Sequence, residues 1–395
     1  MRNTYDRRRI LLVSPRWGHL AGGSETLLRA YAQRLANSER FDVDIATTCA
    51  LSEATWDNEL LAGEFVEGNL RLHRFPARSP NRGAAFLFRQ AFRNPYLIRF
   101  LARLPLSVPS VTSPELIDFI RRERTRYETI VSAPYLHGTT VETVLTAPER
   151  SVIFPCLHDE PAARMGGVGT LLRSAHGRIF NSQVERDLAR RYHGEAAAVG
   201  PVIGIGIDYP AEIAPEEKIR SEFGLVGDYL VYVGRRIPQK GVDRLVSALL
   251  EHNNHYPERA VMLILVGDGS YLPPRDRMFR AVGYVDEPTK HGLLAAALAN
   301  ISFSRMESLS IVLLESWLLG TPAIVDGTGA VLDWQVRRSG GGVSVRSVED
   351  LADAIALMRI PDRRAGMAAA GRRLVTREYT WQTVLAALTR ALGVS

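Results

Sequence analysis

Short runs of apolar and β-branched residues alternate with amphipathic segments along the whole chain. In the first half, the runs that predict strands are Ile10–Ser14, Val43–Thr47, Thr129–Ser132, Val152–Cys156 and Arg178–Asn181. After a Gly- and Pro-rich passage at residues 200–210, strand-like runs resume at Tyr229–Val233, Val261–Val266, Ile301–Phe303 and Ala323–Val325. Strands that alternate with helices are typical of parallel sheets, because each parallel connection needs a crossover. The pattern therefore predicts an α/β fold with two doubly wound units.

The length of the chain agrees with two domains. Its 395 residues exceed what one ordinary hydrophobic core supports. We expect a first Rossmann-like domain at residues 1–205 and a second at 206–378. The helical pattern of Tyr379–Leu392 lies beyond the last predicted strand, and we expect residues 379–395 to pack back on the first domain.

Composition indicates an ordinary globular protein, with 46% apolar and 23% charged residues. Cys49 and Cys156 both lie in apolar, strand-like runs, so we expect buried reduced thiols rather than a disulfide or a metal site. The apolar run behind Met1–Arg9 is too short for a signal peptide, and no run approaches the roughly 20 residues of a membrane span. These features predict a cytoplasmic location.

Positive charge is concentrated between residues 71 and 126, where twelve arginines face three acidic residues. Within this region, Phe86–Leu104 interleaves aromatic residues with arginines. Such a segment suits an anionic membrane surface or a lipid diphosphate, which would make the protein peripheral at the cytoplasmic face. A helix whose arginines are merely solvated is the alternative. Because no recognised nucleic-acid module accompanies the arginines, we expect no nucleic-acid partner.

Two glycines, Gly22 and Gly23, follow the first strand and precede a helix that we expect Ser24 to cap. Glycines let the backbone approach a ligand closely, and a helix start offers N–H groups to a phosphate. The spacing differs from the dinucleotide-binding G-x-G-x-x-G pattern and so gives an oxidoreductase little support. A plain loop remains the alternative.

Two cations lie in the loop after Tyr229–Val233. Gly234 is followed by Arg235, and Lys240 comes just before the next helix. Like charges in one loop repel unless an anion lies between them, and a diphosphate would satisfy both. Two solvated surface cations are the alternative.

Glu307 and Glu315 are separated by seven residues, across the start of an apolar helix. We expect both carboxylates to face one crevice. Glu307 would accept hydrogen bonds from the hydroxyls of a donor sugar, and Glu315 from those of a ribose. The exposed N–H groups of Ser308, Leu309, Ser310 and Ile311 would complete a phosphate cradle. An amphipathic helix also carries two glutamates by chance, but the apolar neighbours of Glu315 make an unpaired charge costly there.

Together, the Gly-Gly loop, the V-G-R…K-G element and the E-x7-E pair resemble glycosyltransferase family 4. The resemblance implies a GT-B fold, in which two Rossmann-like domains face a central cleft. It also implies retaining transfer from a UDP- or GDP-type nucleotide sugar to a carbohydrate, lipid-linked or small-molecule acceptor. No metal and no cofactor beyond the donor is expected.

The resemblance also implies roles for individual residues. The expected catalytic residues are His158, Glu307, Arg235 and Lys240. The expected donor-binding residues are Gly22, Gly23, Gly234, Arg235, Lys240, Gly267, Tyr284, Val285, Ser308, Leu309, Ser310 and Glu315. Leu309-Ser310 departs from the aromatic-glycine pair of the family, so the donor pose or choice is expected to differ.

Three alternatives stay open at this point. Asp159 and Glu160 would suit a nucleophile and acid pair, although the family is thought to lack an obvious nucleophile. Asp42-Val43-Asp44 matches a metal-binding D-x-D, but it lies in an unremarkable predicted strand and is interpreted as no metal site. A non-catalytic partner that binds nucleotide sugars would also use such a donor site.

Overall fold

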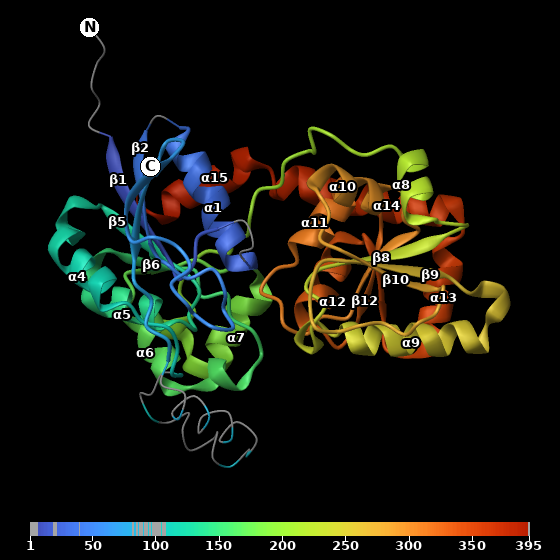
Figure 1. The fold of residues 1–395 in the computed structure, drawn as a ribbon, viewed down its shortest axis with the longest axis horizontal. Coiled ribbons are helices and arrows are strands. Elements are labelled where there is room, and N and C mark those ends of the chain that lie inside the picture. Colours follow the sequence, from blue (N-terminus) through green and yellow to red (C-terminus); the bar gives the residue numbers. More distant parts are fainter. Residues whose placement is uncertain are drawn as a thin grey trace, which may run out of the picture. The chain divides into compact units, whose positions relative to one another are not determined.

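The computed structural model describes residues 7–18, 22–38, 40–80, 83, 86, 90, 94, 96, 104 and 108–393. The chain divides into two compact units, one of residues 1–205 with 385–395 and one of residues 206–384. Each unit is built around its own sheet, with helices packed on it (Figure 1). Among the described helices, none combines the length and the apolar character that crossing a bilayer requires.

The first unit has a seven-stranded sheet in the order β3-β4-β2-β1-β5-β6-β7. Its strands are β1 (Arg8–Ser14), β2 (Phe41–Thr48), β3 (Gly63–Glu67), β4 (Leu70–Phe75), β5 (Thr129–Ser132), β6 (Ser151–Ile153) and β7 (Gly177–Arg178). Its helices are α1 (Gly23–Ala36), α4 (Pro114–Glu123), α5 (Gly138–Thr146), α6 (Gly166–Ser174) and α7 (Gln183–His193). All neighbouring strands are parallel except β3, which pairs antiparallel with β4.

The second unit has a six-stranded, fully parallel sheet in the order β10-β9-β8-β11-β12-β13. Its strands are β8 (Tyr229–Val233), β9 (Met262–Val266), β10 (Phe279–Gly283), β11 (Ala299–Ser302), β12 (Ala323–Asp326) and β13 (Gly342–Val345). Its helices are α8 (Glu216–Phe223), α9 (Val242–His255), α10 (Glu287–Ala295), α11 (Ile311–Leu318), α12 (Ala330–Ser339), α13 (Val348–Met358) and α14 (Pro361–Glu378). This strand order is that of a Rossmann fold, which places ligands at the carboxyl ends of the strands.

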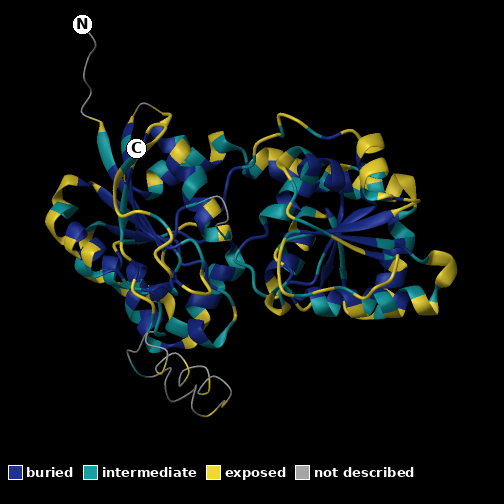
Figure 2. Ribbon diagram, viewed as in Figure 1, coloured by how far each residue is buried: buried dark blue, intermediate teal, exposed yellow. Residues whose placement is uncertain are grey.

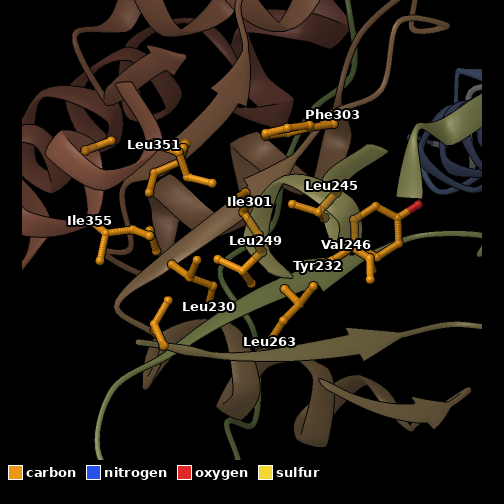
Figure 3. Close-up of a cluster of buried hydrophobic side chains, with 14 of the residues drawn as sticks. Leu230, Tyr232, Leu245, Val246, Leu249, Leu263, Ile301, Phe303, Leu351 and Ile355 are labelled. Atoms are coloured by element: carbon orange, nitrogen blue, oxygen red, sulfur yellow. The ribbon is translucent and has the colours of Figure 1, made fainter. Parts of the chain in front are cut away.

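Alternation along the strands of the second unit explains its two cores. Leu230 and Tyr232 of β8 pack in one apolar cluster with α9 and α13 (Figure 3). Tyr229 and Val231 point to the other face, into a cluster with α8 and α10. Successive strand residues face opposite sides of a sheet, so a strand that is apolar throughout is buried on both faces. The central strands of both units are accordingly buried, whereas many helix residues are exposed (Figure 2).

Several predicted boundaries differ from the structure. The strands β3, β4, β10 and β13 were not predicted, and β6 ends at Ile153 rather than at Cys156. The predicted helix Tyr379–Leu392 begins later, as α15 (Trp381–Ala391), after α14 has ended at Glu378. From Leu385 onward α15 groups with the first unit, where the Leu392 carbonyl accepts a hydrogen bond from the Thr129 hydroxyl at 3.2 Å.

Candidate functional site

Lys240 and Glu307 meet at the carboxyl edge of the second sheet. Lys240 ends the short 3-10 turn that follows β8, and Glu307 lies in the loop between β11 and α11. The Lys240 ammonium Nζ lies 2.7 Å from Glu307 Oε1 and donates to the Met306 carbonyl at 3.2 Å. An ammonium has three donors, so these two contacts leave one for a ligand.

Gly241 allows the two loops to approach each other. Its φ of +66° is left-handed, and an added Cβ would lie 2.2 Å from the Phe303 carbonyl oxygen. Any side chain at residue 241 would therefore push the loop after β8 away from the loop after β11. This close approach explains why Lys240 reaches Glu307, although the two residues are 67 positions apart.

Glu315 is held by a different lysine, Lys290 of α10. Lys290 Nζ lies 3.2 Å from Glu315 Oε1 and 2.7 Å from Glu287 Oε2. Burial lowers the pKa of Lys290, but the attraction of Glu315 and Glu287 outweighs it, and the pKa is raised overall. Lys290 therefore stays protonated at neutral pH and keeps a positive charge beside Glu315.

Ser310 begins α11 in a manner that the sequence did not predict. Its hydroxyl caps the helix by accepting from the Leu313 N–H. Its own N–H donates to Gln335 Oε1 at 2.8 Å, and Gln335 Nε2 returns a bond to the Ser310 carbonyl at 3.2 Å. The expectation that the Ser310 N–H is exposed to a phosphate is therefore wrong, because the buried Gln335 occupies it. Ser308 and Leu309 lie in the loop just before this cap.

The glycines of the second unit form tight turns after neighbouring strands. Gly234 donates to the Val266 carbonyl at 2.9 Å, and Gly267 donates to the Gly283 carbonyl at 2.7 Å. Gly267 has a φ of +115°, and a Cβ there would lie 2.4 Å from the Gly234 carbonyl oxygen. The loops after β8, β9 and β10 are thus tied together. Tyr284 follows β10 with its side chain exposed, whereas Val285 is partly buried against the core.

The neighbouring arginines of the loop after β8 differ. Arg235 is exposed. Arg236 is buried and donates to the carbonyls of Gly267 at 2.8 Å and Tyr271 at 2.6 Å. Arg236 therefore fixes the loop, and Arg235 and Lys240 are the cations of this loop that a ligand could reach.

In the first unit, Gly22 and Gly23 lie at the start of α1. The helix begins at Gly23 with Gly22 as its N-cap residue, so the prediction that Ser24 caps it is wrong. The Ser24 hydroxyl instead donates to Glu25 Oε2 at 2.8 Å. Glu25 in turn forms a buried ion pair with Arg16, whose Nη2 lies 2.6 Å from Oε1. No local motif in the sequence marks this pair, which connects the loop after β1 to the helix.

His158 lies in the segment that follows β6, with its Nδ1 3.6 Å from Glu160 Oε1. Tyr135, from the loop after β5, donates its hydroxyl to the same Glu160 oxygen at 2.9 Å. One residue before His158, the Leu157 N–H donates to Glu185 Oε1 at 2.9 Å. Glu185 Oε2 accepts from the Asn181 N–H at 2.6 Å, so one buried carboxylate fixes two segments.

The acidic residues of the Asp159-Glu160 and Asp42-Val43-Asp44 alternatives contact neighbouring side chains. Asp159 accepts from Arg164 at 2.8 Å and from the Tyr192 hydroxyl; burial raises its pKa, but these contacts lower it overall. Asp44 accepts from the Tyr127 hydroxyl at 2.8 Å, while Asp42 lies 3.6 Å from Arg7. These contacts do not bring Asp159 and Glu160, or Asp42 and Asp44, together around one point.

Among the described residues, Glu287, His291 and Glu315 offer ligand atoms within 4.8 Å of one another. Lys290 donates to two of these carboxylates, so its ammonium takes the place that a metal ion would need. The set therefore fits a lysine better than a metal. The aromatic and arginine-rich segment Phe86–Leu104 lies largely outside the described residues.

Comparison with known proteins identifies the family. Residues 227–358, which include the Lys240–Glu307 and Lys290–Glu315 contacts, match the family model of the glycosyl transferases group 1. A GDP-mannose-dependent alpha-(1-6)-phosphatidylinositol monomannoside mannosyltransferase of Mycobacterium tuberculosis is 30% identical over 274 residues, which cover 58% of this chain and 70% of the relative. The chain belongs to the group 1 glycosyltransferases. A D-inositol 3-phosphate glycosyltransferase of Segniliparus rotundus is also 30% identical, over 56% of this chain and 53% of that protein.

Solved structures show the fold of this glycosyltransferase to be GT-B, as predicted. Sucrose-phosphate synthase from Thermosynechococcus elongatus aligns with a TM-score of 0.71 and 20% identity, covering 98% of this chain and 99% of that chain. WaaG, a glycosyltransferase involved in lipopolysaccharide biosynthesis, aligns with a TM-score of 0.66 and 15% identity, covering 97% and 100%. At these identities the likeness concerns the fold alone.

Within the second unit of the glycosyltransferase, the structure brings Lys240 to Glu307, and it brings the loops of Gly234, Gly267 and Gly283 together. It also adds residues that sequence reasoning missed, namely Lys290 and Gln335. No local motif marks either residue, because each acts across a separation of 25 positions on a partner from another element. Half-buried cations beside carboxylates at the carboxyl edge of a parallel sheet can bind a phosphate and hydroxyl groups together.

Proposed function

We propose that this glycosyltransferase moves a sugar from a UDP- or GDP-type nucleotide sugar to an acceptor hydroxyl, with retention of the anomeric configuration and without a metal. Arg235 and Lys240 bind the diphosphate, Glu307 and His158 contact the transferred sugar, and Glu315 accepts hydrogen bonds from the ribose. The observation that carries the proposal is the 2.7 Å contact between Lys240 and Glu307. This contact brings together the cation that we propose for phosphate binding and the carboxylate that we propose for sugar binding.

The chemistry follows from this contact. Negative charge develops on the diphosphate as the glycosidic bond breaks, and a positioned cation stabilises it without having to reorganise. Lys240 is already oriented by Glu307 and the Met306 carbonyl, so its remaining donor meets the leaving group at little entropic cost. The Glu307 carboxylate offers further acceptor sites to sugar hydroxyls.

The acceptor class is proposed from the relatives. A relative with the name of a phosphatidylinositol mannoside mannosyltransferase supports a glycolipid acceptor and a GDP-type donor. The arginine-rich region at residues 71–126 would help to bind an anionic membrane that carries such an acceptor. Co-sedimentation with liposomes should increase with the fraction of anionic lipid, and binding that ignores lipid charge would argue against this part of the proposal.

The proposal is tested first with donors. Thermal unfolding is measured with GDP-mannose, UDP-glucose, GDP and UDP, each with EDTA present. A ligand at 100 times its dissociation constant should stabilise the protein by about 2.7 kcal/mol. Donor hydrolysis and the anomeric configuration of the product, followed by NMR, then test catalysis and retention. If no nucleotide raises the melting temperature, the proposal fails; if a donor binds but is never cleaved or transferred, the chain is a non-catalytic binding partner.

The glutamate of the ribose site gives a second test. Glu315→Ala should raise the Michaelis constant for the donor more than it lowers turnover, because a ribose contact serves binding in both the ground and the transition state. A fall in turnover at unchanged Michaelis constant would contradict this role.

A further inference from the structure

Lysine is rare in this chain. Of its 49 lysine and arginine residues, only Lys218, Lys240 and Lys290 are lysines. Lys218 is exposed on α8, whereas each of the other two contacts one glutamate of the E-x7-E pair. In a chain that otherwise uses arginine, a lysine at these two positions indicates a need for a compact ammonium rather than a planar guanidinium.

The two lysine–glutamate pairs have similar environments. The Lys240 and Glu307 side chains are 22% and 18% exposed, and those of Lys290 and Glu315 are 14% and 20% exposed. Lys240 comes from the turn after β8 and Lys290 from α10, whereas Glu307 lies in the loop before α11 and Glu315 within α11. Lys290 is the second instance of the arrangement by which Lys240 holds Glu307.

The environment of Lys290 fixes its position. Asp286 caps α10 by accepting from the Thr289 N–H at 2.8 Å, which sets where the helix begins. The Thr321 hydroxyl donates to the Leu294 carbonyl at 2.7 Å and so ties α10 to the segment after α11. Lys290 therefore reaches Glu315 from a fixed helix, and its second contact with Glu287 at 2.7 Å orients the ammonium.

The Glu315 carboxylate is only partly used by the protein. Oε1 accepts from Lys290, and among the described residues Oε2 is buried without a hydrogen-bond partner. An ionised carboxylate has about four acceptor sites and no donor, so acceptor sites of Glu315 remain for hydroxyl groups of a ligand. Without Lys290, Glu315 would lose the contact that orients its carboxylate.

We propose that Lys290 is a positioning residue for recognition of the nucleotide ribose: it holds the Glu315 carboxylate in the orientation in which it accepts hydrogen bonds from the ribose hydroxyls. The inference rests on the proposed function, in which Glu315 binds the ribose. Among the described residues, Glu287, His291 and Glu315 offer ligand atoms within 4.8 Å of one another, so the test is made with EDTA present to exclude cation binding there.

The experiment measures affinity by calorimetry for GDP and for 2′,3′-dideoxy-GDP, or for the uridine pair if the wild type prefers uridine. Lys290→Met should weaken binding of the ribonucleotide about tenfold or more, the size of a hydrogen bond to a charged group, and should change binding of the dideoxy nucleotide less than twofold. Lys290→Arg should retain part of the difference between the two nucleotides. Lys218→Met, which removes the exposed lysine, should change neither affinity.

The outcomes separate the inference from its premise. Equal losses for both nucleotides would overturn the positioning role, because they would reflect general damage to the second unit, and so would no loss for either. If Lys290→Met does not fold, Lys290→Gln and Glu287→Gln take its place, and an unchanged ratio of the two affinities in Lys290→Gln overturns the inference. A wild-type protein that binds GDP, UDP and their dideoxy forms with no preference for the ribose overturns the ribose role of Glu315 itself. A protein that binds no nucleotide overturns the proposed function.

Discussion

The two units place charged side chains after their strands in opposite ways. In the second unit, Lys240–Glu307 and Lys290–Glu315 are ion pairs that keep 14–22% of their side-chain surface exposed. In the first unit, Arg16, Glu25 and Glu185 are almost completely buried, and Glu185 is bound by backbone N–H groups rather than by a cation. Partly exposed pairs remain accessible to a ligand, whereas buried charges are fully committed to fixing loops.

The cost of removing one partner of a charged pair depends on how deeply the pair is buried. A buried charge loses its hydration, and its partners must replace that loss, so removing a partner is costly. A half-exposed pair loses less, and its removal should affect ligand chemistry more than folding. Variants of the buried pair in the first unit should therefore act on stability, and variants of the partly exposed pairs in the second unit on catalysis.

The largest expected effect is the loss of stability from Arg16→Met. The substitution leaves Glu25 buried without its cation, and breaking a buried pair in this way costs about 3–5 kcal/mol of the free energy of unfolding. Burial raises the pKa of Glu25, but the attraction of Arg16, together with hydrogen bonds from Ser24 and the backbone, lowers it overall. Chemical unfolding measures the effect.

A matched control is Arg121→Met, which breaks an exposed pair with Asp118 and should cost at most about 1 kcal/mol. The double variant Arg16→Met with Glu25→Gln should recover part of the loss. Equal effects of Arg16→Met and Arg121→Met would contradict the distinction between buried and exposed pairs.

The next effect in size concerns catalysis in the second unit. Lys240→Ala should slow donor cleavage about a hundredfold or more, corresponding to about 2.7–4 kcal/mol of barrier by analogy with oxyanion donors. Unfolding should change much less than in Arg16→Met. Because Lys240 and Glu307 touch, the double variant with Glu307→Gln should cost less than the sum of the two single variants. Near-normal cleavage by Lys240→Ala would remove this lysine from the mechanism.

The smallest effect is a pH dependence that arises from Glu185. Burial raises the pKa of Glu185 from its ordinary 4.5 to about 7, although backbone N–H groups oppose the shift. The folded state therefore holds this proton more tightly than the unfolded chain does. Its contribution to stability is present below pH 4.5 and is lost as the pH rises toward 7, by at most about 3 kcal/mol at about 1.4 kcal/mol per unit.

The variant Glu185→Gln should lack this part of the pH dependence, since an amide does not titrate. Unfolding at several pH values between 4.5 and 8 measures it, with the exposed Glu149→Gln as control. A variant whose pH profile keeps the slope of the wild type would refute the assignment to Glu185.

Prediction from the sequence succeeded where strands are buried on both faces. The predicted strands Thr129–Ser132 and Tyr229–Val233 coincide with β5 and β8, which lie inside their sheets and are apolar without interruption. Of the missed strands, β3, β10 and β13 are sheet edges, whereas β4 lies between β3 and β2. On β3 most side chains are exposed, so the apolar run that signals a strand is diluted by polar residues.

Short motifs beside a strand, like the central strands, can be recognised from neighbouring residues along the chain. Lys240 and Glu307 each stand in a short loop directly after a strand, and the topology of a parallel sheet brings such loops to one edge. The cap of α11 was misjudged, because the partner of the Ser310 N–H is Gln335 from a different helix. Local spacing carries no information on a partner of that kind.

By itself the sequence determined the α/β class, the succession of most strands in both units and the glycine and charge motifs after them, because these depend on neighbours along the chain. Only the tertiary structure decided that Lys290 holds Glu315, that Gln335 occupies the Ser310 N–H and that Glu185 fixes the segment before His158. These contacts join residues 25 to 28 positions apart. The packing of the helices on the sheets decides which distant groups meet. Packing maximises apolar burial, and the polar residues that it brings together carry no recognisable pattern in the sequence.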